Sequence, residues 1–219
     1  MHPSRTVLLA SRGPWCHVTR GPLRTPKSNT LPYSNDIQAH VIDALDGSTA
    51  DAPSHPELVK PFQEKIGCLM YACRSTRPDI CYAVHLLCRV LSRPTPACMA
   101  EADRVLAYLG RHPSVGLTYA AGPSAFRGFA DASWEERNST TGWITLWQMA
   151  ALTWGSRKQS AIALSSCEAE IVALSEAAKD TVYLRRFITG VDKGAIDGPT
   201  DLATDNQGAR ATACNPVSH

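Results

Sequence analysis

The sequence contains no Cys-x-x-Cys pair, although it has eight cysteines in 219 residues. A zinc site would need closer pairing of cysteine and histidine than this spacing offers. Five of the cysteines lie among apolar neighbours in a region of helical periodicity, namely Cys68, Cys73, Cys81, Cys88 and Cys98. We interpret them as small core residues of a protein in a reducing compartment.

Long hydrophobic runs are missing as well. No segment approaches the ~20 apolar residues that a membrane span requires. The apolar run at residues 7–10 is too short for the core of a signal peptide. We therefore expect an intracellular protein, cytoplasmic or nuclear and not secreted, that has no membrane partner.

An excess of charge of either sign is also absent, because the formal net charge is +2. Such a balance neither requires nor excludes a nucleic-acid partner. With 44% hydrophobic and 19% charged residues, the composition is that of a globular protein. The first thirty residues carry basic side chains and no acid, so they are either a phosphate-binding tail or a solvated linker.

The chain is expected to have three parts. Residues 1–54 are interrupted by prolines and have no sustained apolar period, which predicts a poorly ordered segment. Residues 55–114 carry three amphipathic patterns, which predict a small helical subdomain. Residues 115–219 hold β-like runs, a long helical pattern, a short β-like run and a second helical start; the β-like runs are 115–120, 126–133, 140–148, 150–156 and 200–204. This order predicts an α/β domain.

The start of the long helix, "ALSSCEAEIVALSEA", holds two glutamates with different roles. Residues two apart do not share a helical face. Ser165 and Glu168 fit a capping box, in which Glu168 accepts from the Ser165 N–H group; such a cap contributes about 1 kcal/mol. Glu170 is left over, on the face that is expected to pack on a sheet. It is either a rim glutamate paired with a basic residue or a ligand in a functional site.

Two aspartates offer partners for such a ligand. Asp131 follows a β-like run in "FRGFADASW", and Asp205 follows another in "TDLATDNQGA". Single aspartates at these positions are commonly caps or turn formers. Together with Glu170, however, they could converge at one end of a sheet, where their mutual repulsion would require cations. Oxygen ligands favour Mg²⁺ or Mn²⁺, and two such ions about 4 Å apart can promote phosphodiester hydrolysis.

Several longer motifs occur in a fixed order along the chain, namely "GCLMYACRSTRPDICYAVHLLCRVLSRPT", "FADASW", "STTGWITL", "TWGSRKQ", "ALSSCEAEIVALSEAAKD" and "TDNQGA". In this order and spacing they resemble the ribonuclease H region of copia-type retrotransposon polyproteins, from about Phe62 to His219. The resemblance implies a ribonuclease H-like mixed sheet, with an antiparallel three-strand meander plus one parallel strand. The preceding helical part resembles the segment that connects the polymerase to this domain.

The resemblance also implies roles for individual residues. Asp131, Glu170 and Asp205 match the first three metal-binding carboxylates of the family, which holds two Mg²⁺ or Mn²⁺ ions. The implied activity is hydrolysis of the RNA strand of an RNA–DNA hybrid during reverse transcription, with the polymerase portion of the polyprotein as a partner. Such a site would recognise A-form-like shape, 2′-hydroxyls and phosphates more than base sequence.

Five further residues are candidates for contact with the hybrid. Arg157, Lys158 and Gln159 match a motif that could contact its backbone, although a solvated hairpin edge would also explain the two basic residues. Asn206 and Gln207 open a helix beside Asp205, where they either position a phosphate or cap the helix.

The sequence departs from the family at two points. Ser133 stands where the family usually has a second acid in the first motif. The fourth carboxylate of the family lies downstream of "NPVSH", a stretch that these residues lack, so we expect weak or absent Mg²⁺-dependent cleavage. No Tyr-x-Asp-Asp polymerase motif is present. The second hypothesis is therefore a catalytically inactive nucleic-acid-binding or structural remnant.

Overall fold

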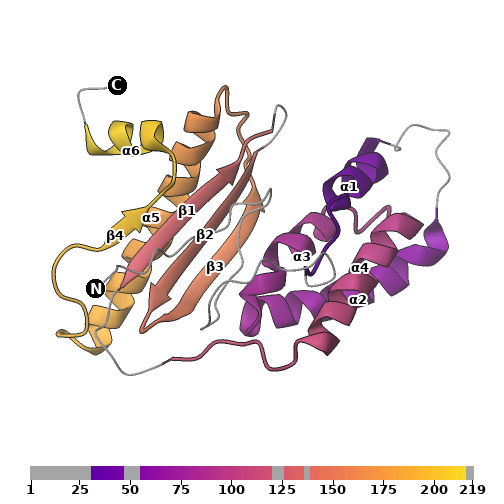
Figure 1. The fold of residues 1–219 in the computed structure, drawn as a ribbon, viewed down its shortest axis with the longest axis horizontal. Coiled ribbons are helices and arrows are strands. Elements are labelled where there is room, and N and C mark those ends of the chain that lie inside the picture. Colours follow the sequence, from indigo (N-terminus) through magenta and orange to yellow (C-terminus); the bar gives the residue numbers. More distant parts are fainter. Residues whose placement is uncertain (1–30, 47–54, 120–125, 136–138, 216–219) are drawn as a thin grey trace, which may run out of the picture. The chain divides into compact units, whose positions relative to one another are not determined.

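The computed structural model describes residues 31–46, 55–119, 126–135 and 139–215. Their elements belong to two compact units that divide between Gly116 and Leu117, and each unit is considered by itself (Figure 1). One unit contains helices α1 to α4, and the other contains strands β1 to β4 with helices α5 and α6. The basic tail predicted for the first thirty residues lies outside the described residues.

The helical unit is built on the amphipathic patterns that the sequence shows between residues 55 and 114. Its elements are α1 (Ile37–Asp46), α2 (Pro56–Ser75), the 3-10 turn η2 (Pro78–Ile80), α3 (Cys81–Cys88) and α4 (Pro96–Arg111). Their apolar faces meet in one core, whose largest fully buried members include Phe62, Ile66, Leu69, Tyr82, Leu86 and Leu87. The thiols of Cys73 and Cys98 are buried in the same core.

Helix α1 lies within the segment for which the sequence predicted poor order. Ile37, Val41 and Ala44 follow helical spacing and bury their side chains in the core of the unit. The sequence prediction missed this helix because it spans only ten residues and follows a segment interrupted by prolines. Its order depends on packing against α3 and α4, which local sequence does not reveal.

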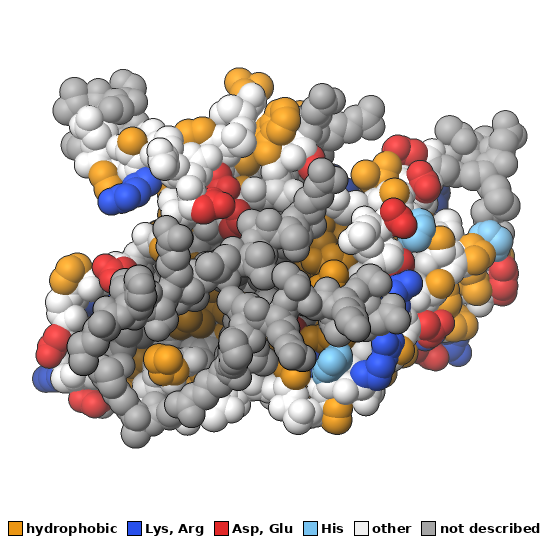
Figure 2. Space-filling model, viewed as in Figure 1, with side chains coloured by type: hydrophobic (Ala, Val, Ile, Leu, Met, Phe, Trp, Pro, Cys, Tyr) orange, Lys and Arg blue, Asp and Glu red, His pale blue; other side chains and the backbone are white. Residues whose placement is uncertain are grey.

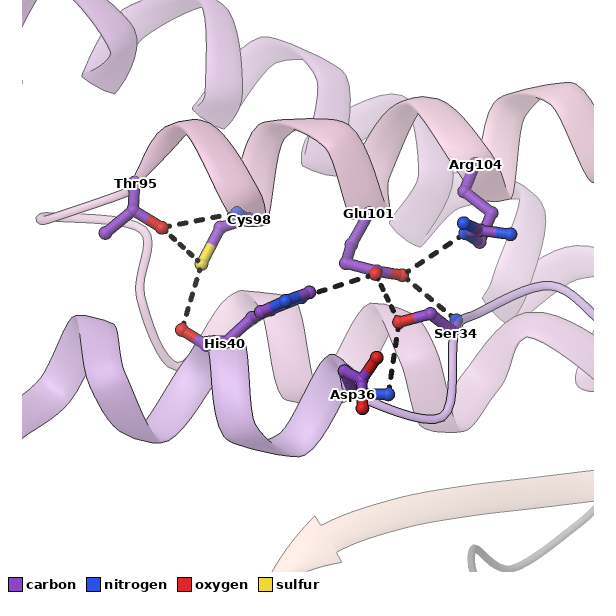
Figure 3. Close-up of polar contacts among 7 residues, drawn as sticks. All are labelled: Ser34, Asp36, His40, Thr95, Cys98, Glu101 and Arg104. Carbon is purple, nitrogen blue, oxygen red and sulfur yellow. Dashed lines mark hydrogen bonds and ion pairs between the residues drawn. The ribbon is translucent and has the colours of Figure 1, made fainter.

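A buried carboxylate ties α1 and the segment before it to α4. Glu101 is 4% exposed and accepts hydrogen bonds from the backbone N–H group of Ser34 at 3.1 Å and from the Ser34 hydroxyl. The Nδ1 atom of His40 lies 3.4 Å from the same carboxylate, and Nε of Arg104 lies 3.7 Å from it (Figure 3). Buried charge is costly unless it is paired in this way, so Glu101 fixes where α1 docks.

The second unit is a mixed sheet, as the sequence predicted. Strands β1 (Arg127–Ser133), β2 (Thr140–Trp147) and β3 (Ala150–Lys158) form an antiparallel meander, and β4 (Asp201–Ala203) pairs parallel to β1, giving the order β3-β2-β1-β4. The strand expected at residues 115–120 was wrong, because residues 115–119 form no strand. There the Tyr119 hydroxyl instead donates to the carbonyl of Ala151 at 2.7 Å.

Helix α5 (Ser166–Val191) packs along one face of this sheet (Figure 1). Small residues bring it close, since Ala173 and Ala177 bury against Ala130 of β1. The contact is closest at Gly128, where an added Cβ atom would come within 2.7 Å of the Thr181 hydroxyl. Because small residues let α5 pack close to β1, this packing determines where the start of the helix, with Glu168 and Glu170, lies. Helix α6 (Gln207–Cys214) follows β4.

Surface charge in the helical unit is mixed, in keeping with the near-neutral balance of the chain. On the face shown in Figure 2, acidic, basic and histidine side chains of this unit are interspersed. Among the helices that the structure describes, none has the length and apolar character needed to cross a membrane.

Candidate metal centre

Three carboxylates meet at one edge of the sheet. Asp131 comes from β1, Glu170 from the first turns of α5, and Asp205 from the turn between β4 and α6. One carboxylate oxygen from each lies within 4.8 Å of the others. The parallel pairing of β1 and β4 explains part of this convergence, because parallel strands end at the same edge of a sheet. We call Asp131, Glu170 and Asp205 the carboxylate cluster.

The start of α5 positions the glutamate of this cluster. Ser165 is the N-cap, and its hydroxyl accepts from the N–H group of Glu168 at 3.2 Å. The other half of the predicted capping box was wrong in its donor, because Glu168 accepts from the N–H group of Leu164 at 2.7 Å. With the helix start fixed, Glu170 faces the sheet and is only 5% exposed.

Both oxygens of Glu170 are held by groups next to the other two carboxylates. Its Oε1 atom accepts from the N–H group of Ala132, the residue after Asp131, at 3.2 Å. Its Oε2 atom accepts from the hydroxyl of Thr204, the residue before Asp205, at 3.3 Å. Glu170 therefore links the end of β1, and the residue that follows β4, to α5. The sequence reasoning missed Thr204, whose only local signal is its place between a short strand and an aspartate.

Burial and crowding of negative charge disturb the ionisation of the carboxylate cluster. Burial, followed by the charge of Asp131, raises the pKa of Glu170 from its usual 4.5 to about 7. Burial and then the charge of Asp205 raise the pKa of Asp131 above its usual value. Asp205 itself is exposed. Asp131 and Glu170 thus resist ionisation in this setting, and a bound cation would remove that resistance.

The donor set fits a hard divalent cation. All three side chains offer carboxylate oxygens, which are the ligands that Mg²⁺ and Mn²⁺ prefer, and the described cluster includes no nitrogen or sulfur donor. The exposed Asp205 leaves the cluster open to solvent on one side. The cluster can therefore bind a cation that remains accessible to a substrate.

Comparison with known proteins agrees with the motifs of the sequence, although no family model matches. Over 73% of its length the chain is 33% identical to the retrovirus-related Pol polyprotein from transposon TNT 1-94 of Nicotiana tabacum, of which it covers 12%. Over 70% of its length it is 30% identical to the Pol polyprotein from transposon RE1 of Arabidopsis thaliana, covering 11% of that protein. A similar share is 33% identical to a Ty5-1 transposon protein of Saccharomyces cerevisiae, of which it covers 47%. The chain belongs to the copia-type retrotransposon Pol polyproteins.

This Pol segment is also similar to a protein of a different description. It is 38% identical, over 57% of its length, to secreted RxLR effector protein 161 of Plasmopara viticola, and it covers 91% of that protein. By contrast, the segment spans about a tenth of the length of the tobacco and Arabidopsis polyproteins.

The basic residues predicted to contact a hybrid lie at the end of β3 in the Pol segment. Arg157 is paired with Glu176 of α5, and its guanidinium carbon lies 5.7 Å from the centroid of the Trp143 ring. It is 54% exposed in spite of this pairing. Lys158 is also exposed. Both side chains are therefore open to solvent on the edge of the meander.

Gln159 lies in a different environment, since it is 5% exposed. Its side-chain amide donates to the Thr141 hydroxyl and to the carbonyl of Ala169, both at 2.9 Å. It thus joins the end of β3 to β2 and to α5. Asn206 caps α6, where its side chain accepts from the N–H group of Ala209 at 2.9 Å, and Gln207 is exposed as the first residue of that helix.

Proposed function

We propose that this Pol segment is a ribonuclease H-type domain, which hydrolyses the RNA strand of RNA–DNA hybrids formed in reverse transcription. The observation that carries the proposal is the convergence of Asp131, Glu170 and Asp205 within 4.8 Å. The mixed sheet, with its antiparallel meander and one parallel strand, is consistent with a ribonuclease H-like fold. Membership of the copia-type Pol polyproteins supports a role in retrotransposition.

The residues of the cluster have separate tasks in this proposal. Bound Mg²⁺ or Mn²⁺ would supply the positive charge that activates water and stabilises the leaving oxygen of the phosphodiester. Asp131 and Glu170, held on β1 and α5, would provide the fixed side of the ion site. Asp205, which is exposed, would complete the site on the side that substrate approaches.

Substrate contact is assigned to the exposed polar residues near the sheet edge. Arg157 and Lys158 provide positive charge for phosphates, which dominates affinity for nucleic acids and makes it sensitive to salt. Gln207 is exposed beside Asp205 and can reach solvent. Gln159 and Asn206 are given supporting roles, because their side chains already hold β3, α5 and the start of α6 in place.

A second candidate is nucleic-acid binding without turnover. It is favoured by the exposed basic residues Arg157 and Lys158 at the end of β3, which would hold phosphates whether or not a metal ion is bound. Binding of the hybrid through this basic edge would then occur without cleavage.

One experiment separates the two candidates. The purified chain is incubated with an RNA–DNA hybrid labelled on the RNA strand, with Mg²⁺ or Mn²⁺, and duplex DNA serves as the substrate control. The first candidate predicts slow, metal-dependent cleavage of the RNA that is lost in both Asp131→Asn and Asp205→Asn. Salt-sensitive binding without cleavage at any metal concentration would support the second, and absence of both cleavage and binding would overturn both.

A further inference from the structure

The feature that carries a further inference is the hydroxyl of Thr204, which lies between two of the proposed ligands. It donates to Oε2 of Glu170 at 3.3 Å and accepts from the N–H group of Asn206 at 3.3 Å. The hydroxyl therefore links the side chain of one ligand to the backbone on the far side of another, because Asp205 lies between Thr204 and Asn206. A hydroxyl suits this position, since it donates and accepts at once.

Thr204 lies just after a short strand. Strand β4 pairs with β1 at three positions and ends at Ala203, so Thr204 and Asp205 lie just beyond its last paired residue. Helix α6 begins at Gln207. Asp205 thus lies between the last paired residue of β4 and the first residue of α6, and the Thr204 hydroxyl gives this turn a hydrogen bond to α5.

We infer that Thr204 is a positioning residue of the metal centre, which fixes Glu170 and Asp205 at the separation needed to share a cation. The inference rests on the proposed function in that it takes the carboxylate cluster as the ion site. Thr204 touches no reacting atom in this assignment and acts through Glu170 and the turn. Hydrogen bonds of this kind orient metal ligands, and losing one commonly lowers metal affinity by about 10- to 100-fold.

The test compares variants that keep or remove the hydroxyl. Thr204→Val keeps the shape of the side chain without the hydroxyl, whereas Thr204→Ser keeps the hydroxyl. Thr212→Val is the matched control, because its hydroxyl donates to the carbonyl of Gly208 within α6 and contacts no ligand. Mn²⁺ affinity is measured by electron paramagnetic resonance of the free ion, and thermal melting in EDTA reports the fold of each variant.

We expect Thr204→Val to bind Mn²⁺ about tenfold more weakly, with Thr204→Ser and Thr212→Val within threefold of wild type. In the cleavage assay, Thr204→Val should lower kcat at fixed Mn²⁺, leave KM for the hybrid unchanged, and recover at high Mn²⁺. If Thr204→Val fails to melt cooperatively, Thr204→Ala takes its place with the same expected loss.

Two results would overturn the inference in distinguishable ways. If Glu170→Gln abolishes Mn²⁺ binding while Thr204→Val binds like wild type, Thr204 does not position the site and the proposed function stands. If Asp131→Asn and Glu170→Gln bind Mn²⁺ as well as wild type does, the carboxylate cluster is not the ion site and both proposals fail.

Discussion

The substitution Glu170→Gln should stabilise the metal-free protein at alkaline pH while removing its response to metal. Glutamine keeps the size of the side chain and removes the charge that is buried beside Asp131 and Asp205. The pKa of Glu170 is raised from 4.5 to about 7. At ~1.4 kcal/mol per pKa unit, the ionised form therefore costs the folded state at most about 3.5 kcal/mol.

The sign of the effect follows from proton linkage. Between pH 4.5 and 7 the folded protein holds the Glu170 proton more tightly than the unfolded chain does, so the stability of wild type falls as pH rises through this window. Well below pH 4.5 the group is protonated in both states. The variant should therefore come close to wild type at pH 4.5 and exceed it by about 3 kcal/mol at pH 8, which corresponds to roughly 15 °C in melting temperature.

Tryptophan fluorescence is a selective probe of this unfolding. The described residues include four tryptophans, all in the sheet unit, namely Trp134, Trp143, Trp147 and Trp154. Melting is followed in EDTA at pH 4.5 and pH 8, with Asp197→Asn as the control because Asp197 is exposed in the same unit. On adding Mn²⁺, wild type should gain stability by mass action and the variant should gain little. Equal melting of wild type and Glu170→Gln at pH 8, or the same difference at both pH values, would refute the reasoning.

Three further predictions concern packing and substrate contact. Glu101→Ala should destabilise the helical unit by about 2–4 kcal/mol, because it leaves the Ser34 N–H group without its acceptor. Urea denaturation followed by circular dichroism measures the effect, and an unchanged midpoint would contradict the prediction. Gly128→Ala should cost about 1–3 kcal/mol, because its Cβ atom would lie 2.7 Å from the Thr181 hydroxyl, and tryptophan fluorescence in urea measures it. Arg157→Ala should weaken hybrid binding and reduce the slope of log affinity against log salt by about 1; fluorescence anisotropy at several salt concentrations would refute the contact if the slope did not change.

The sequence predicted those parts of the structure that local patterns determine. Closely spaced runs rich in β-branched and aromatic residues indicated the meander, and Ser165, three residues before Glu168, indicated the start of α5 as a helix cap. Once that start is known, the rotation of the helix places Glu170 toward the sheet. The convergence with Asp131 and Asp205 was predicted because each aspartate follows a β-like run, and the family resemblance supported it. The three carboxylates do lie close together.

One difference from the prediction is local. Glu168 accepts from the N–H group of Leu164 and not from that of Ser165, a shift of one residue that spacing alone does not resolve.

The other features depend on contacts between separate elements. Thr204 donates to Glu170 across 34 positions of sequence, and Gln159 is buried where it donates to the carbonyl of Ala169 in α5. Helix α1 forms because it packs against α3 and α4. These three features are consequences of tertiary packing, which single-residue propensities do not capture.

Because strand β4 is short, the sheet holds Asp205 less firmly than it holds Asp131, the other aspartate of the carboxylate cluster. Strand β4 holds Asp205 at the margin of the sheet through three paired positions, whereas Asp131 lies on a strand with neighbours on both sides. A cation bound between Asp131 and Asp205 would therefore stabilise the β4 edge of the sheet, which backbone pairing alone holds weakly. Amide hydrogen exchange at Leu202 and Ala203 would then slow on metal loading far more than exchange in β2. The exchange rate in β4 would therefore report whether the metal site is occupied.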